Sequence, residues 1–294
     1  MPPIITNIQK NLFLTGIPPD RCYSQIIVES TKPLSYTCQQ QPRDCILTFF
    51  GAGLNMPAGI IVADDGLLKN IIIREEKQRV KIAIDFGYPT IIDCSATATP
   101  PYRLLINFNR CFLEKLCWNK KIIIDPGHGG KDCGLQGPVG LWEKDAVLDT
   151  AYHLRKIFEL AGARVWLTRQ GDENVSTETR IASLQQQRAH LYIGLHLRKG
   201  VAGRERGFAL IVPPKTKQME KLAQEIGTAM SKKLNLADNG IQTDKNLLVL
   251  GLPAIVIETA TITQAVEEGL LRSSHFQWRI AQAIFNATLK YFNS

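Results

Sequence analysis

From Lys120 onward, apolar runs and amphipathic stretches alternate along the chain. Residues 121–124 are one lysine followed by three isoleucines, a composition typical of a buried strand, and Asp125-Pro126-Gly127 is a strong stop signal. In residues 144–161 the apolar positions recur with a helical period, and Gly162 ends the pattern. This stretch therefore predicts a helix with one buried face.

The same alternation continues to the C-terminus. Strands are predicted for residues 163–168, 191–195, 207–212 and 252–258, and helices for about 176–188, 217–236 and 275–292. Strands that alternate with helices form a mostly parallel sheet. Residues 119–294 are therefore predicted to form an α/β domain with a mostly parallel sheet and helices on both faces.

The region before residue 112 has a shorter rhythm. Its β-rich runs recur about every ten residues and are separated by turn-forming segments such as Gly51-Ala52-Gly53 and Asp64-Asp65-Gly66. The runs are CYSQIIVES, CILTFF, AGIIVA, LLKNIII, RVKIAIDF and YRLLINF. No helical period is sustained between them. The pattern is typical of a small β-sandwich, so we predict an all-β N-terminal domain over residues 1–112.

Composition narrows the class of protein. The chain has 294 residues, 45% of them hydrophobic and 21% charged, as in ordinary globular proteins. No apolar run approaches the roughly 20 residues of a membrane helix, so we expect no membrane insertion. The first residues, MPPIITNIQKNLFLTGIPPD, lack a basic segment and a long apolar core, so we expect no signal peptide within this chain.

The net charge of +8 is compatible with a polyanionic partner or with a solvated surface. Nucleic acid, an anionic membrane and an acidic cell-wall polymer are the polyanions concerned. Aromatic and basic residues do not interleave as in a nucleic-acid-binding module. We therefore do not expect a nucleic-acid partner.

Cysteines are numerous for a chain of this kind. The seven are Cys22, Cys38, Cys45, Cys94, Cys111, Cys117 and Cys133. No two of them form a C-x-x-C pair, which argues against a structural zinc site built from cysteines. They are either buried thiols, the interpretation that we favour, or include one or two disulfides formed in an oxidising compartment.

Four side chains with catalytic potential follow predicted strands or begin a predicted helix. His128, His196 and Glu258 each follow or end a strand. Glu143 begins the first helix. In an open parallel sheet, ligands bind outside the carboxyl ends of the strands. We therefore expect these two histidines and two glutamates to converge on one edge of the sheet.

Each of these residues, taken alone, has a structural explanation. His128 could bond a carbonyl in its glycine-rich loop, and His196 could be a satisfied core histidine. Glu143 is favourable to the dipole of the helix that it begins. Glu258 is harder to explain, because a charge at the end of a buried strand needs a partner. The structural explanations give no reason for all four to share one edge.

Two neutral imidazoles and one carboxylate are a ligand set of catalytic zinc, with the fourth position left for water. A second carboxylate could take a proton from that water and pass it to a leaving amine. Sequence spacing does not decide which glutamate is the ligand and which the base. A phosphate-binding loop is excluded, because its motif needs glycine in place of Asp125 and serine or threonine in place of Asp132.

The chain contains, in this order, the segments IIIDPGHGGKDCG…EKD, VWLTRQGDENVSTETR, LYIGLH and LPAIVIET. Together they resemble the zinc-dependent N-acetylmuramoyl-L-alanine amidases, which cut bacterial peptidoglycan, and the resemblance spans residues 120–294. Upstream, SQIIVESTKPLSYTCQQQPRDCILTFFGA and RVKIAIDFGYP resemble the AMIN domain, a β-sandwich that often precedes these amidases and directs them to the cell wall. The resemblance implies an AMIN-like domain over 1–112 and a zinc amidase domain over 119–294.

The resemblance also implies site residues and a reaction. It implies zinc bound by His128, Glu143 and His196, with Glu258 as the general acid/base. The reaction is hydrolysis of the amide between the lactyl carbonyl of N-acetylmuramic acid and the L-alanine nitrogen of the stem peptide. The partner is then peptidoglycan, and the location is the periplasm or another extracytoplasmic part of the cell envelope. We expect a monomer.

Departures from the family pattern affect neither an implied ligand nor the implied base. Leu197 and Arg198 stand where the family commonly has a small residue and asparagine, and Cys133 replaces the usual proline. After Glu258 the chain has Thr259-Ala260, where the family usually has a glycine. We hypothesise that Arg198 pairs with a carboxylate of the stem peptide; the alternative is a solvated arginine at the rim.

Some members of the family carry an inserted helix that plugs the zinc site. Only eleven residues separate His196 from Phe208, too few for such a helix and its connections. We therefore predict a cleft that is open without an activator. Two other functions remain open from the sequence: a cell-wall-binding protein with a degenerate amidase domain, and a zinc peptidase acting within stem peptides.

Overall fold

The computed structural model describes residues 1–15, 22–63, 65–201 and 205–292. The chain divides into two compact units, Met1–Lys115 and Leu116–Ser294, and buried apolar residues fill the interior of each. The helix α1 (Cys111–Cys117) spans the division. Among the described helices, none is long and apolar enough to cross a membrane.

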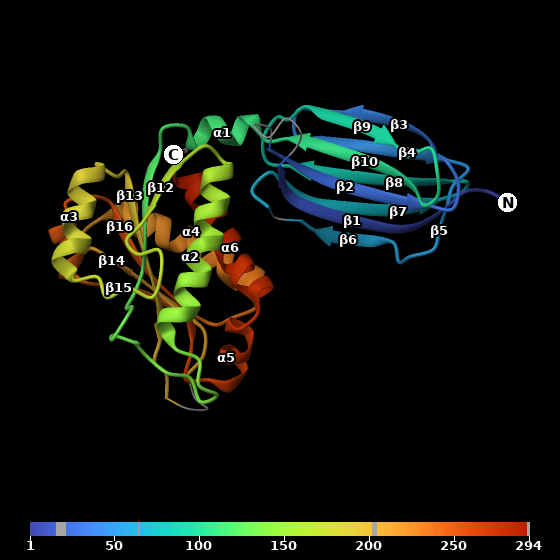
Figure 1. Ribbon diagram of the computed structural model, residues 1–294. Helices are drawn as coiled ribbons and strands as arrows, with labels where there is room; N and C mark the ends of the chain where they lie inside the picture. Colours follow the sequence, from blue (N-terminus) through green and yellow to red (C-terminus); the bar gives the residue numbers. More distant parts are fainter. Residues whose placement is uncertain (16–21, 64, 202–204, 293–294) are drawn as a thin grey trace. The chain divides into compact units, whose positions relative to one another are not determined.

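Within the described residues, the N-terminal unit consists of two five-stranded sheets (Figure 1). The first has the order β5 (Gly53–Leu54), β1 (Ile4–Thr15), β2 (Cys22–Ser30), β10 (Tyr102–Asn109) and β9 (Ile92–Ala96). The second has the order β3 (Ser35–Gln40), β4 (Asp44–Phe50), β8 (Arg79–Phe86), β7 (Leu68–Glu76) and β6 (Gly59–Val62).

The two N-terminal sheets pack face to face. Alternate residues of β8 are buried, as expected for a strand with one face on the core. Phe86 of β8 and Phe108 of β10 belong to different sheets, and their ring centroids lie 6.0 Å apart. The prediction of a sheet-rich N-terminal region is therefore confirmed, whereas its AMIN-like identity stays a prediction.

The C-terminal unit is built on one six-stranded sheet, within the residues that the structure describes. Its order is β12 (Arg164–Leu167), β11 (Lys121–Pro126), β13 (Leu191–Arg198), β16 (Ala254–Thr261), β14 (Phe208–Val212) and β15 (Asp238–Thr243). The first four of these strands are parallel to one another, and β14 runs antiparallel to β16. The predicted α/β domain with a mostly parallel sheet is confirmed.

Helices cover both faces of this sheet (Figure 1). They are α2 (Glu143–Leu160), α3 (Thr177–Gln187), α4 (Lys217–Leu234), α5 (Ala265–Leu271) and α6 (Ser274–Phe292), with a 3₁₀ turn, η1 (Lys245–Leu250). Figure 1 shows α3 on one side of the sheet and α2, α4 and α6 on the other. Because both faces are covered, Ile122, Ile123 and Ile124 of β11 are all at most 1% exposed, which explains the uninterrupted apolar run.

Candidate metal centre

A glycine-rich loop carries His128 beyond the carboxyl end of β11. His128 has a φ of 61°, in the left-handed region that side chains rarely occupy. A Cβ on Gly127 would lie 2.2 Å from Cε1 of His196, and one on Gly134 would lie 2.6 Å from Cδ2 of His128. The glycines are therefore needed for the backbone to pass close to both imidazole rings.

His128, Glu143 and His196 converge at the carboxyl edge of the sheet. They come from the loop after β11, the first residue of α2 and the end of β13. One ligand atom of each lies within 4.8 Å of the other two. Oε1 of Glu143 is 3.2 Å from Nε2 of His128 and 3.1 Å from Nδ1 of His196. Two imidazole nitrogens and a carboxylate gathered in this way are a donor set that suits a divalent metal ion.

Asp132 orients the ring of His128 from its other side. Its Oδ2 lies 2.9 Å from Nδ1 of His128, so that Nε2 is the nitrogen turned toward Glu143. In metal sites, a carboxylate on the far imidazole nitrogen fixes the tautomer and the ring orientation. Sequence reasoning did not single out Asp132, although its position four residues after the histidine was the available signal.

Electrostatics keep Glu143 ionised although its side chain is only 2% exposed. Burial opposes ionisation, but hydrogen bonds with His128 and His196 and from the backbone N–H groups of Leu135 and Leu197 outweigh it, so the pKa of Glu143 lies well below its usual range. The hydrogen bond between His128 and Glu143 raises the pKa of His128 to about 8, although burial opposes this shift. The carboxylate of Glu143 is therefore ionised at neutral pH, with the imidazole of His128 as its partner.

Arg169 holds the backbone of the histidine loop. Its guanidinium is 2% exposed and donates to the carbonyls of Pro126 and Gly127, both at 3.0 Å, and of Lys144 at 2.7 Å. These carbonyls belong to the loop that carries His128 and to the first turn of α2. One buried cation thus ties together the two segments that supply His128 and Glu143.

A second arginine and a buried carboxylate support the same loop. Arg180 of α3 donates to the carbonyl of His128 at 2.8 Å and also pairs with Asp125 at the end of β11. Asp125 further accepts hydrogen bonds from Thr168 and from the hydroxyl of Tyr192, the latter at 2.5 Å. Because the three partners of Asp125 come from α3, from the segment after β12 and from β13, the network fixes how β11 ends.

Glu258 lies beside the cluster but outside the group of three. It is paired in register with His196 on the neighbouring parallel strand. Burial raises the pKa of Glu258, and the nearby Arg198 and His196 partly oppose this. Nε of Arg198 lies 3.8 Å from Oε2 of Glu258, and Nη1 lies 3.4 Å from Oε2 of Glu205. Among the described residues, the buried Nη1 atom has no hydrogen-bond partner.

Two adjacent buried carboxylates of α5 hold loops near the cluster. Glu268 accepts hydrogen bonds from the backbone N–H groups of Val139 and Leu141, at 2.6 and 2.8 Å, in the segment that leads to Glu143. Glu267 accepts from the N–H of Gly207 at 2.8 Å, just before β14. Neither was singled out from the sequence, because their partners lie far away along the chain.

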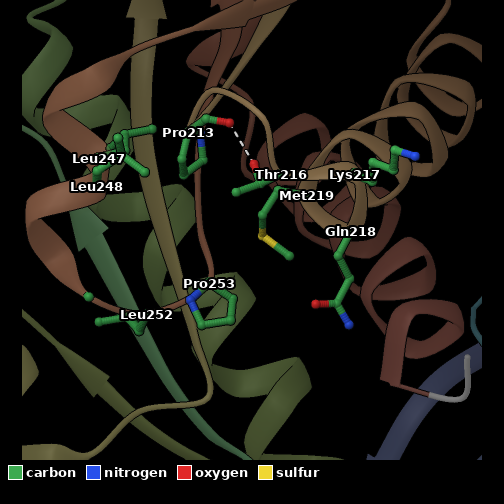
Figure 2. Close-up of a pocket in the computed structure, with 10 residues that line it drawn as sticks. Pro213, Thr216, Lys217, Gln218, Met219, Leu247, Leu248, Leu252 and Pro253 are labelled. Atoms are coloured by element: carbon green, nitrogen blue, oxygen red, sulfur yellow. Dashed lines mark hydrogen bonds between the residues drawn. The ribbon is translucent and has the colours of Figure 1, made fainter.

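A separate apolar pocket lies at the opposite edge of the sheet (Figure 2). Its volume is about 440 Å³. Pro213 follows β14 and Pro253 precedes β16, whereas Glu258 and His196 lie toward the carboxyl ends of their strands. Figure 2 shows Met219 of α4 lining the pocket together with leucines of η1. The pocket is therefore not part of the candidate metal centre.

The sequence of the C-terminal unit is similar to those of known amidases. Residues 122–290, more than half of the chain, match the family of N-acetylmuramoyl-L-alanine amidases. The amidase LytC of Bacillus subtilis is 28% identical over 175 residues, which are 58% of this chain and 35% of that protein. The amidase AmiC of Escherichia coli is 25% identical over 366 residues, covering 93% of this chain and 88% of that protein.

A solved structure has the same fold in the C-terminal unit. The N-acetylmuramoyl-L-alanine amidase AmiC2 of Nostoc punctiforme matches with a TM-score of 0.54 and 25% identity, over 60% of this chain and 98% of that one. This chain spans only 35% of LytC and 34% of a second Bacillus subtilis relative, the putative N-acetylmuramoyl-L-alanine amidase YrvJ. By its match over residues 122–290, the chain belongs to the N-acetylmuramoyl-L-alanine amidase family.

Proposed function

We propose that this chain hydrolyses the amide bond between N-acetylmuramic acid and the L-alanine of peptidoglycan stem peptides. The observation that carries the proposal is the convergence of His128, Glu143 and His196 within the segment that matches the amidase family. Relatives named as N-acetylmuramoyl-L-alanine amidases support the choice of substrate.

We assign zinc to the three converging side chains. Two imidazoles and one carboxylate form a ligand set of hydrolytic zinc, which keeps a fourth position open. The ionised Glu143 has the charge that suits a metal ligand, and Asp132, bonded to Nδ1 of His128, leaves Nε2 of that ring facing the site. When bound, the zinc polarises the scissile carbonyl and lowers the pKa of a water molecule to about 7.

In this proposal Glu258 is the general acid/base. Its carboxylate accepts a proton from the attacking water and then donates it to the departing L-alanine nitrogen. Its place in register with His196 supports this assignment. Burial raises the pKa of Glu258, which is the direction that suits a carboxyl group that must release a proton as well as take one.

We further propose that the N-terminal unit is an AMIN-like domain that directs the enzyme to the cell wall. Its two packed sheets and the match of AmiC of Escherichia coli over 93% of this chain support this. The enzyme would act in the periplasm or another extracytoplasmic part of the envelope, where its substrate lies.

The site is proposed to be open without an activator. In the described residues between β13 and β14, 199–201 and 205–207, there is no helix, and residues 202–204 lie outside the described part of the chain. Purified protein should therefore release stem peptides from isolated cell-wall sacculi without any added protein.

The test digests purified sacculi with wild-type protein and with Glu258→Gln, identifies the products by mass, and measures bound zinc in both. We expect the wild type to release intact stem peptides that begin with L-alanine. We expect Glu258→Gln to lose about 10²–10⁴-fold in rate, the usual contribution of a general acid/base, while keeping its zinc.

A matched control is Glu159→Gln, an exposed carboxylate near the other end of α2, which should behave as wild type. Products cleaved within the stem peptide would identify a peptidase instead. Zinc binding without any product would identify a wall-binding protein with an inactive centre. Either result would overturn the proposal.

A further inference from the structure

Three cysteines from three strands gather at one edge of the N-terminal unit. They are Cys38 of β3, Cys45 of β4 and Cys94 of β9, and all three carry free thiols. The thiol of Cys38 interacts with the thiols of both Cys45 and Cys94. Thiols brought together from separate strands are candidates for a covalent bond, so the geometry of each pair decides between them.

The strands that carry Cys38 and Cys94 are edge strands of different sheets. β3 is the last strand of one sheet and β9 the last strand of the other, and Figure 1 shows them at the same side of the unit. Residues 36, 38 and 40 point to one side of β3, because side chains alternate along a strand. Nε2 of Gln40 donates to the carbonyl of Thr90 at 2.7 Å. The side chain of Tyr36 hydrogen-bonds to Cys94.

The pair Cys38–Cys45 has an unfavourable register. In the β3–β4 ladder Cys38 is opposite Leu47, and Cys45 is opposite Gln40, so the two cysteines are diagonal neighbours. Diagonal neighbours have Cα atoms about 7–8 Å apart, whereas a disulfide usually needs about 4.4–6.8 Å.

A three-thiolate metal site is not favoured either. Among the described residues, the group of three ligand atoms within 4.8 Å of one another is His128, Glu143 and His196. The three sulfur atoms are therefore too dispersed to share an ion, whereas Cys38 and Cys94 need only each other.

We propose that Cys38 and Cys94 form a disulfide that joins the edge strands β3 and β9 of the two N-terminal sheets. The two thiols give up two protons and two electrons as the S–S bond forms. The electron acceptor is the disulfide of a thiol–disulfide oxidoreductase, or glutathione disulfide in vitro, which is reduced to two thiols through a mixed disulfide. The proposal goes beyond the amidase activity, since it concerns the N-terminal unit. It can be right or wrong whether or not the C-terminal unit is an amidase.

The bond is structural rather than a redox switch. Burial raises the pKa of Cys38, and burial together with neighbouring acidic groups raises the pKa of Cys94 to about 11. Little thiolate exists at neutral pH in the folded protein, so exchange with other thiols is slow. The disulfide would form during folding, and it would close the open edge of the two packed sheets, where both edge strands expose unpaired backbone groups.

The test is peptide mapping of the full chain after oxidative folding with glutathione and glutathione disulfide. Free thiols are blocked, and trypsin is used without reduction. Trypsin cuts after Arg43, between Cys38 and Cys45, and after Lys81 and Arg103 on either side of Cys94. Cys22 lies in the same tryptic peptide as Cys38, so fragmentation of the linked peptide shows which of these two sulfur atoms is bonded. We expect a peptide with Cys38 linked to the peptide with Cys94, and separation of the two on reduction.

Thermal unfolding gives the second readout. Closing a loop of this length should raise the Tm of the N-terminal unit by on the order of 10 °C over the reduced protein. Cys38→Ser and Cys94→Ser should unfold at the same temperature with and without reductant, which separates loss of the bond from a packing defect. Cys45→Ala is the matched control, and it should keep both the linked peptide and the dependence on reductant.

Blocked, unlinked Cys38 and Cys94 in the folded oxidised protein would overturn the proposal. So would a linked peptide that joins Cys38 to Cys45. Because hydrolysis of sacculi is measured separately, failure of this inference is distinguishable from failure of the proposed function.

Discussion

Two carboxylates, one in each unit, are almost equally buried but differ in their hydrogen-bond partners. Asp65 in the N-terminal unit is 0% exposed and Glu143 in the C-terminal unit is 1% exposed. Oδ1 of Asp65 accepts from the N–H groups of Leu67 and Leu68. Oδ2 accepts from Ser24 and from Arg110, the latter at 3.0 Å. Each oxygen has donors of its own, and a buried cation balances the charge.

Glu143 is arranged differently. Its Oε2 accepts from the N–H of Leu135 at 3.0 Å, but its Oε1 is close to three polar groups at once. The N–H of Leu197 lies 2.8 Å from Oε1, and both His128 and His196 direct a ring nitrogen at the same atom. Neutral imidazole brings a lone pair as readily as a proton. Burial therefore does not distinguish a structural carboxylate from a candidate metal ligand, whereas the nature of its hydrogen-bond partners does.

The largest effect is expected from Glu143→Gln, which keeps the shape of the side chain and removes its charge. We expect zinc affinity to fall more than about 1,000-fold, since the binding free energy of a protein-bound zinc ion is on the order of 10 kcal/mol and is shared here among three side chains. Hydrolysis of sacculi should fall to background. The measurement is zinc content after dialysis against graded chelator concentrations, together with released stem peptide.

Asp145→Asn is the control for this substitution, because Asp145 lies in the same first turn of α2 and is exposed. It should bind zinc as the wild type does. If Glu143→Gln bound zinc with wild-type affinity, the carboxylate would be a structural group like Asp65, and the contrast between them would disappear.

The next effect is expected on stability rather than on chemistry. Asp65→Asn leaves the cation of Arg110, which is 1% exposed, without its buried carboxylate. Removing one partner of a buried ion pair typically costs about 3 kcal/mol or more. We expect the free energy of unfolding of the N-terminal unit to fall by about that amount, measured by urea titration. Zinc content should not change.

A surface ion pair supplies the comparison. Glu76 lies 2.9 Å from Lys81, with side chains 42% and 37% exposed, and Glu76→Gln should cost less than about 1 kcal/mol. An equal effect of the two substitutions, or loss of zinc in Asp65→Asn, would contradict the distinction between the two carboxylates.

The hydrophobic pattern predicts the elements whose apolar residues face the core more readily than edge strands, although the exposed edge strand β6 is predicted from its apolar run and β1 is not. β11 and α2 are evident in the sequence because their apolar residues face the core. β3 and β15 lie at sheet edges and consist mostly of exposed residues, so they need no apolar alternation and show none. β9, which carries Cys94, is missed for the same reason.

At the candidate centre, topology makes part of the site predictable. His128 and His196 follow parallel strands, and the carboxyl ends of such strands meet at one edge whatever the separation in sequence. Arg180 and Tyr192 are different, since they reach Asp125 across 55 and 67 residues through side chains with no periodic signature. Asp65 falls in a segment that indicates a turn, and nothing in the sequence shows that Arg110 covers it.

The smallest effect is expected at Arg198. Like Arg110 it lies beside carboxylates, but like the candidate metal centre it is incompletely paired. Unlike Arg110, it lies 3.4 and 3.8 Å from its two glutamates, and its buried Nη1 has no hydrogen-bond partner in the part of the chain that the structure describes. A guanidinium that is incompletely paired beside Glu258 can donate hydrogen bonds to an anionic group of the substrate. For stem peptides with free carboxylates, we expect Arg198→Ala to lower kcat/KM about tenfold, the effect of one charged hydrogen bond.

Amidated stem peptides should be affected less, because they offer no anion for Arg198 to pair with. Arg198→Lys should restore part of the preference for acidic stems, since it keeps the charge but not the planar fork. Lys199→Ala removes an exposed neighbouring cation and should change neither substrate. Equal turnover of acidic and amidated stems by wild type and Arg198→Ala would show that Arg198 serves only to balance Glu205 and Glu258, and so belongs with Arg110 as a structural cation.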